Sequence, residues 1–405
     1  MNETTLNRQK SLRWALLVLG VILLLFLGLS YAWSVFRGPL IQEFGWTAAQ
    51  ASTTFSISMM MFCLGGLVAG IINSKTGPRL TMILCAIFLA AGFFAASQIQ
   101  SLIGIYLSYG VCCGFGVGLG YNTAISTVVK WFPDKQGLIS GISLMGFGFG
   151  SMILGTVAAS MITSMGWRAT FRLFAIAFGV IMLLAAFLLR KATPEFVQHL
   201  SQGNAKPVPP SVEEAGCGEM LRRRNFWLYF LWAIVLSAAG LAIINSSATY
   251  AGLFVGDNLT MAAAIAGIVS IANGVGRVIF GGLFDKIGYR ITMLIDCVVF
   301  VIAALVLMAS YSSGSMAVLI AAFILIGLAY GGVTPTNSAF IAYFFGRKNY
   351  ALNFSIVNLN LIVASYLGPM VGNSGYMATF WAIIVFAVIA AVLVFLLKRP
   401  NIPSN

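Results

Sequence analysis

Long runs without a single charged residue are the feature that most constrains this chain. Residues 80–129 and 297–346 are each 50 consecutive residues without Asp, Glu, Lys or Arg. A helix that spans a bilayer needs about 20 apolar residues, so each run is long enough for two such helices. Polar breaks at 97–101 and 312–314 mark the turn inside each run. The runs predict an integral membrane protein.

The other apolar stretches bring the prediction to twelve spans. The first half adds 14–36, 44–74, 136–167 and 169–189, and the second half adds 225–256, 258–284 and two helices within 349–397. The stretch between the halves is hydrophilic and rich in proline and charge, as linkers are. The sequence therefore predicts an all-α integral membrane protein with a six-helix bundle at 1–190, a linker at 191–224 and a second six-helix bundle at 225–405.

The distribution of charge predicts how the chain lies in the membrane. Only 8% of the residues are charged, against about 25% in soluble domains, which excludes a soluble enzyme. With a cytoplasmic N-terminus, the cytoplasmic segments hold nineteen of the 23 Lys and Arg residues, three lie outside, and Arg277 lies within a span. This bias fits the positive-inside rule. The net charge of +13 thus indicates topology rather than a nucleic-acid partner, and both termini are expected in the cytoplasm of a bacterial inner-membrane protein.

The two halves of the sequence repeat each other. Residues 69–85 align with 280–296 at an offset of 211. The identical pairs are Gly70 and Gly281, Lys75 and Lys286, Gly77 and Gly288, Arg79 and Arg290, Thr81 and Thr292, and Met82 and Met293. Parallel six-helix repeats are typical of secondary transporters whose substrate site lies near the middle of the membrane, between the halves.

Several motifs carry a resemblance to a known family. Residues 281–290, GGLFDKIGYR, resemble the loop signature of the major facilitator superfamily, and the first-half copy has Ser74 where the second half has Asp285. The stretches YAW at 31–33, EFGW at 43–46 and KWFPDKQG at 130–137 are similar to the monocarboxylate transporter and oxalate/formate antiporter group of that superfamily. The resemblance covers nearly the whole chain and implies a transporter of small carboxylates.

Arg277 is the sharpest candidate for substrate binding. It lies eight residues before Asp285, or about 12 Å along a helix, which places it well inside the membrane. An arginine at the centre of a span costs roughly 2.5–3.5 kcal/mol on insertion scales, so a function is expected. Its planar guanidinium matches a carboxylate. The alternative is a structural pair with a buried acid or with backbone carbonyls; the resemblance implies the substrate-binding role.

Polar side chains of other spans are expected to complete the site. The resemblance implies cavity-lining tyrosines, and the amides in the spans either bind substrate or join helices. These candidates are Tyr31, Tyr121, Tyr330, Asn122, Asn245, Asn273 and Asn358. Asn273 stands where mammalian-type relatives carry an aspartate, and residues 354–358 lack the second cation of the oxalate type. A single central cation favours a single carboxylate, because a second negative charge would stay uncompensated.

A proton carrier has few candidates among the ten acidic residues. Most of them lie at the N-terminus, in the linker or in loops, which leaves Glu43, Asp257 and Asp296. Asp257 is preferred because it precedes the eighth span on the predicted outer side, although a helix cap explains it as well. Asp296, near the inner end of the ninth span, is the second candidate, and its simpler explanation is pairing with a basic loop residue.

The sequence thus predicts a transporter of small monocarboxylates such as lactate or pyruvate, driven by proton symport with alternating access. It is expected to act as a monomer in the bilayer, without a metal or cofactor. Carboxylate exchange of the oxalate/formate kind is the alternative. An intramembrane enzyme is disfavoured because the only histidine, His199, lies in the linker and no span holds a nucleophile with a base or a set of metal ligands. The duplication disfavours a receptor or channel.

Overall fold

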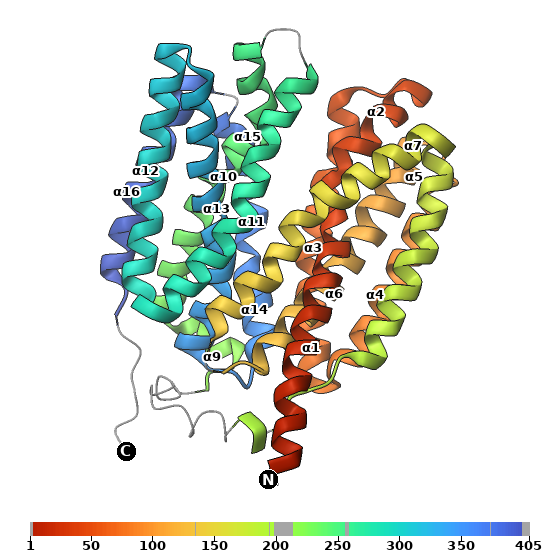
Figure 1. Cartoon of the computed structure of the whole chain (residues 1–405), viewed down its shortest axis with the longest axis vertical. Helices are drawn as coiled ribbons and strands as arrows, with labels where there is room; N and C mark the ends of the chain where they lie inside the picture. Colours follow the sequence, from red (N-terminus) through yellow and green to blue (C-terminus); the bar gives the residue numbers. More distant parts are fainter. Residues whose placement is uncertain are drawn as a thin grey trace. The chain divides into compact units, whose positions relative to one another are not determined.

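Helices account for the whole architecture of the described chain. A computed structural model describes residues 3–133, 135–193, 195–197, 214–255, 259–372 and 374–398, and these residues form no strand (Figure 1). Eleven helical segments are long and apolar enough to cross a membrane. One of them, α7 (Gln136–Leu188), has 53 residues, or about 80 Å of helix, more than twice the hydrocarbon thickness. The non-helical Gly166 (φ 80°, ψ 160°) divides it, which gives the twelve predicted spans.

The described helices follow one another in two series. The first series is α1 (Glu3–Leu27), η1 (Gly28–Ala32), α2 (Trp33–Phe44), α3 (Ala48–Lys75), α4 (Pro78–Ala96), α5 (Leu102–Ile105), η2 (Tyr106–Cys113), α6 (Gly114–Lys130) and α7. The second series is α9 (Cys217–Arg222), α10 (Arg224–Val255), α11 (Leu259–Ile287), α12 (Tyr289–Ser313), α13 (Met316–Phe345), α14 (Tyr350–Asn358), α15 (Asn360–Gly372) and α16 (Tyr376–Leu396).

The chain clusters into two compact units. The first unit contains Met1–Asp134, Gly146–Val208 and Asn349–Ile356, and the second contains Lys135–Met145, Pro209–Lys348 and Val357–Asn405. The beginning of α7 therefore packs with the second unit, and most of α14 packs with the first. Within the second unit, the helices α12 and α16 pack against each other and can be followed in cyan and violet in Figure 1.

Three irregular segments interrupt the spans. The first span changes to a 3₁₀ turn at η1, the fourth contains the π-helix η2, and Leu359 separates α14 from α15. Backbone irregularity at membrane depth is tolerated only where protein surrounds it or where it lines a cavity. The break at Leu359 directly follows Asn358, one of the predicted site residues.

The sequence repeat is also a repeat of backbone conformation. Gly77 (φ 90°, ψ −174°) immediately precedes α4, and Gly288 (φ 81°, ψ 169°) immediately precedes α12. Such positive φ values are open to glycine and strained for other residues. The same glycine therefore makes the same sharp turn between two spans in each half.

The outer face of α16 illustrates why these helices need a bilayer. Trp381, Val385, Val388, Val392 and Phe395 recur at helical spacing and are all more than half exposed. The opposite face buries Phe380, Ile383, Ala387, Ala390 and Val394. A helix that is apolar on all sides is stable at a protein surface only if lipid covers its outer face.

Candidate functional site

Arg277 lies buried within α11, with only 8% of its surface exposed. Its Nε donates a hydrogen bond to Asn273 Oδ1 (3.2 Å), one turn earlier on the same helix, and its Nη1 donates to the carbonyl oxygen of Leu144 in α7 (2.7 Å). Arg277 stands ten residues before the end of α11, or about 15 Å along the helix. Arg277 therefore lies well inside this helix, as predicted from the sequence.

Close helix packing fixes the position of Arg277. A Cβ atom on Gly276 would collide with the carbonyl of Leu328 in α13, and one on Gly331 would collide with the carbonyl of Asn273. On the other side, a Cβ on Gly141 of α7 would collide with the carbonyl of Arg277 itself. Small residues at helix contacts let backbones approach closely in membranes. The backbone that carries Arg277 is thus held between α7 and α13 of the second unit.

The surroundings of Arg277 are rich in hydrogen-bond donors. The Oδ1 of Asn273 is used by Arg277, while its buried Nδ2 has no acceptor among the described residues. Tyr330 of α13 lies within electrostatic range of Arg277, and its ring packs against Gly240 of α10. The two hydrogen bonds of Arg277 described above end on neutral acceptors. A guanidinium, an amide N–H and a phenol in one place suit an anionic ligand with an apolar part.

A chain of hydrogen bonds between polar side chains of this unit ends at Asn358. The hydroxyl of Tyr229 in α10 donates to Asn337 Oδ1 (2.8 Å), and Asn337 Nδ2 donates to Asn358 Oδ1 (3.3 Å). All three side chains are at most 5% exposed. Of these three residues, only Asn358 was predicted from the sequence as a site residue. Tyr229 and Asn337 are additional members that only the packing of α10, α13 and α14 reveals.

Two other predicted residues belong to the first unit. The ring of Tyr121 in α6 packs against Phe62, Phe147 and Phe354, with centroid distances of 4.9, 5.1 and 6.4 Å. The neighbouring Asn122 donates from Nδ2 to the carbonyl of Ala351 (3.2 Å), and its buried Oδ1 has no donor among the described residues. Tyr121 therefore belongs to an aromatic cluster, and Asn122 offers a free acceptor.

Three predicted residues are not placed. The side chains of Tyr31 and Asn245 and the whole of Asp257 lie outside the described residues. The structure thus groups Arg277, Asn273 and Tyr330 in the second unit, joins Asn358 to Asn337 and Tyr229 there, and places Tyr121 and Asn122 in the first unit.

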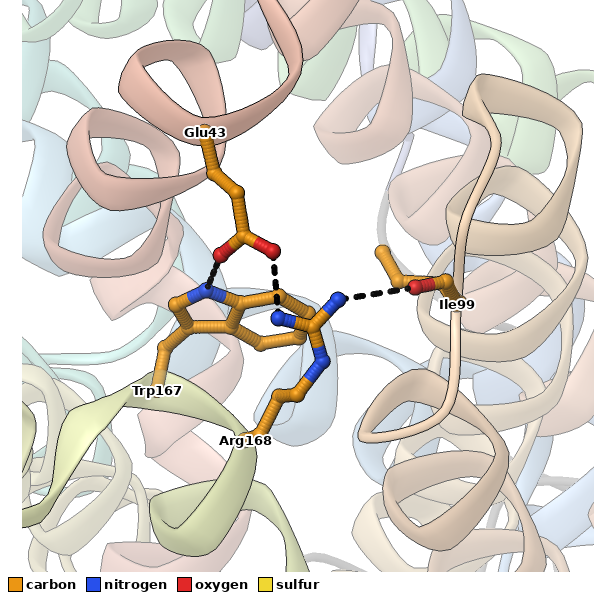
Figure 2. A network of polar contacts seen from close by, with 4 residues as sticks. All are labelled: Glu43, Ile99, Trp167 and Arg168. Atoms are coloured by element: carbon orange, nitrogen blue, oxygen red, sulfur yellow. Dashed lines mark hydrogen bonds and ion pairs between the residues drawn. The ribbon is translucent and has the colours of Figure 1, made fainter.

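Glu43 is held by partners that the sequence did not suggest. Figure 2 shows its carboxylate between Trp167 and Arg168, which follow the break of α7 at Gly166. Trp167 Nε1 donates to Glu43 Oε2 (2.7 Å), Arg168 Nη1 donates to Oε1, and Arg168 Nη2 reaches the carbonyl of Ile99 (3.3 Å). The Arg168 guanidinium also lies 4.2 Å from the centre of the Trp167 ring. Glu43 therefore joins three segments of the first unit.

Asp285 in the last turn of α11 caps another helix. Its Oδ1 accepts from the backbone N–H of Gly137 (3.0 Å) and its Oδ2 accepts from that of Leu138 (2.7 Å), in the first turn of α7. Carboxylates stabilise helix N-termini by accepting from these otherwise unpaired N–H groups. In the first-half copy, the Ser74 hydroxyl instead donates within its own helix, to the carbonyl of Ile71 (2.7 Å).

Asp296 of α12 is buried, and its side chain forms no hydrogen bond with the described residues. It is 1% exposed, and neither carboxyl oxygen has a partner among the described residues. The pairing with a basic loop residue that would explain it most simply is therefore not present in the described structure. Asp296 does lie within electrostatic range of Tyr229 and of its neighbour Cys297.

Comparisons with known proteins agree with this architecture. The chain is 28% identical over 404 residues to the oxalate:formate antiporter of Oxalobacter formigenes, which covers 96% of this chain and 93% of that protein. It is 25% identical to monocarboxylate transporter 13 of Bos taurus, over 86% of this chain and 79% of that one. The fold is similar to that of the Escherichia coli fucose:proton symporter FucP, with a TM-score of 0.68 and 16% identity over 95% of this chain and 98% of that chain.

A family model decides the assignment. The model described as the Major Facilitator Superfamily matches residues 17–369, which is most of the chain. The match runs from within α1 to within α15 and contains Arg277 and both copies of the repeat. The chain therefore belongs to the major facilitator superfamily and is a multi-pass membrane transporter rather than an enzyme.

Proposed function

We propose that this transporter carries small monocarboxylates of the lactate or pyruvate kind by proton symport with alternating access. The observation that carries the proposal is Arg277, a cation buried in the middle of α11 beside the amide N–H of Asn273, which has no acceptor among the described residues. A carboxylate accepts hydrogen bonds from both groups and brings a negative charge to the guanidinium. The monocarboxylate transporter among the relatives supports this substrate class.

The preference for one carboxylate follows from the charges of the spans. Apart from Arg277, neither α11 before Asp285 nor the stretch from α14 to α15 contains Lys or Arg. A dicarboxylate would bring a second negative charge that these helices cannot match, and an unpaired charge at low dielectric is costly. The ring of Tyr330 offers an apolar surface for a short carbon chain.

Carboxylate exchange is the alternative function. The relative from Oxalobacter formigenes, which is an oxalate:formate antiporter, aligns over 96% of this chain. In an exchanger, carboxylate on the opposite side of the membrane replaces the proton gradient as the driving force. This alternative keeps Arg277 as the substrate-binding residue and removes the need for a proton carrier.

The proposed arrangement in the cell follows the charge distribution. We infer an inner-membrane protein with both termini in the cytoplasm, six-helix halves at 1–190 and 225–405 joined by the linker 191–224, and activity as a monomer.

One transport assay distinguishes proton-driven uptake from carboxylate exchange. Purified protein in liposomes takes up labelled lactate, formate or oxalate, with and without an inward proton gradient and with and without internal carboxylate.

The symport proposal expects lactate uptake that rises with the proton gradient and is insensitive to membrane potential, because a monoanion with one proton carries no net charge. Uptake that ignores the gradient but requires internal carboxylate establishes the exchanger instead. Absence of uptake of all three acids by protein that is folded and correctly inserted contradicts the carboxylate proposal as a whole.

A further inference from the structure

Asp296 is a buried acid that hydrogen bonding does not explain. It lies seven residues into α12, or about 10 Å along the helix, with both carboxyl oxygens buried and unpaired among the described residues. An ionised carboxylate in such a place costs far more than a paired one, and acids inside membrane spans commonly mark proton relays. Asp296 is therefore a candidate for a group that takes up and releases a proton.

The internal repeat shows that the fold does not require an acid at this position. In the alignment of 69–85 with 280–296, Asp296 corresponds to Cys85. Cys85 lies seven residues into α4, as Asp296 lies seven residues into α12, and both are buried. The first half thus fills the same place with a small neutral side chain. The carboxyl group of Asp296 is an addition to the second half alone.

The surroundings of Asp296 connect it with a predicted substrate residue. Tyr229 of α10 lies within its electrostatic range and donates to Asn337, which in turn donates to Asn358. The ring of Tyr229 is held by stacking on Phe340, with centroids 3.7 Å apart. A change in the charge of Asp296 therefore acts electrostatically on Tyr229, whose hydroxyl starts this chain of hydrogen bonds.

Titratable groups that interact electrostatically with Asp296 lie on α10 and α12. Cys297 is its neighbour on α12, and Tyr229 belongs to α10. The helices α13 and α16, which pack against α12, contain no acidic or basic residue. The charged residues of α11 are Arg277, Asp285 and Lys286, and the two described bonds of Asp285 go to α7. Tyr229 is thus a described group through which the charge of Asp296 can act on another helix.

We propose that Asp296 is the proton-binding residue of this transporter and that Tyr229 and Asn337 pass its protonation state to Asn358. The inference rests on the proposed proton-coupled carboxylate transport and names the group that carries the proton. In this scheme one proton binds the Asp296 carboxylate from one side of the membrane and leaves it on the other, with no other reactant. Tyr229 is a positioning residue that responds to the charge.

The test compares two transport modes of the same purified protein in liposomes. Gradient-driven accumulation of labelled lactate requires proton movement, whereas exchange of lactate for lactate at equal pH on both sides does not. Asp296→Asn is expected to retain exchange and to lose at least tenfold in accumulation. Asp296→Cys, which introduces the residue found at Cys85, is expected to behave alike. Glu195→Gln, which neutralises an exposed acid, is the matched control and is expected to accumulate lactate as the wild type does, while Asp257→Asn tests the other candidate for the proton carrier.

A second readout does not depend on transport. A protonated carboxylic acid has a carbonyl infrared band that an ionised carboxylate lacks, and the wild type is expected to lose such a band on titration to high pH. The band is expected to be missing from Asp296→Asn and Asp296→Cys. Tyr229→Phe, which keeps the stacked ring, is expected to shift the pH at which this band disappears.

The results separate this inference from the proposed function. If the wild type accumulates lactate with the gradient and Asp296→Asn does so equally well, or if Asp257→Asn alone loses accumulation, Asp296 is not the carrier while symport stands. If the wild type ignores the gradient, symport itself is wrong and the inference fails with it. If both Asp296 variants are misfolded, the wild type and Tyr229→Phe still decide: absence of a titrating carbonyl band from the wild type, or an unshifted band in Tyr229→Phe, contradicts the proposal.

Discussion

Replacing Arg277 by alanine is the perturbation that most directly tests the substrate site. A carboxylate bound by the guanidinium gains two charge-assisted hydrogen bonds, each worth about 1.5–3 kcal/mol. Loss of both removes about 3–6 kcal/mol, and since 1.36 kcal/mol corresponds to a factor of ten, lactate affinity is expected to fall roughly 10²- to 10⁴-fold. Arg277→Lys keeps the charge but not the planar fork, so we expect a loss of about 10- to 100-fold.

Arg277→Ala is expected to leave the protein folded. Without Arg277, the Leu144 carbonyl and Asn273 Oδ1 lose their donor. Each unpaired acceptor costs about 1–3 kcal/mol, or about 4 kcal/mol for both at mid-range. Removing a buried arginine from a span returns about 2.5–3.5 kcal/mol on insertion scales. The net change in the free energy of unfolding is therefore expected to be about 1 kcal/mol, small beside the effect on binding.

Calorimetric titration of purified protein with lactate measures the affinity, and thermal unfolding in the same detergent measures the stability. Arg172→Ala is the matched control, since Arg172 is an exposed arginine of the first unit. It is expected to bind lactate normally. Lactate binding of wild-type strength by folded Arg277→Ala refutes the assignment of the substrate site, whereas equal losses in Arg172→Ala point to a general effect of removing positive charge.

Three further predictions concern selectivity, Asp285 and Glu43. The wild type is expected to bind lactate at least tenfold more tightly than oxalate in competition assays, and the opposite order reveals a second cation at the site. Asp285→Asn is expected to lower the free energy of unfolding by about 1–2 kcal/mol, because it removes the charge that two N–H groups of α7 donate to; an unchanged thermal midpoint contradicts this capping role. Glu43→Gln is expected to cost less than about 1 kcal/mol, because the ion pair with Arg168 is partly exposed and the glutamine oxygen still accepts from Trp167. The same variant is expected to keep gradient-driven uptake, and its loss shows that Glu43 takes part in proton coupling.

The spans, the family and the burial of Arg277 were predictable from the sequence because each depends on local composition. Fifty residues without a charge have few alternatives to two spans, and a lone arginine inside such a span is visible without any partner. The family and the all-α membrane fold are confirmed by the match over 17–369 and by the helices. The roles of the individual site residues remain predictions.

Contacts between distant spans could not be predicted in this way. In the sequence, Asp285 looks like an ordinary acidic residue of a loop. Only the contact of α7 with α11 shows that it caps the start of a helix nearly 150 positions earlier in the chain. Tyr229 and Asn337 are common residue types for a span, and no periodicity indicates that they meet.

The long helix α7 has a consequence for how the protein is made. Its two spans are joined at Gly166 without a polar loop, so a ribosome delivers 53 residues, with Arg168 and Arg172 as their charged members, to the insertion machinery with a single glycine as the point of reversal. Such a pair is expected to enter the bilayer together as a hairpin rather than one helix after the other. Trp167 and Arg168 follow the reversal directly, and Glu43 has already been synthesised when they emerge. Engagement of this carboxylate is then expected to fasten the turn of the hairpin to α2.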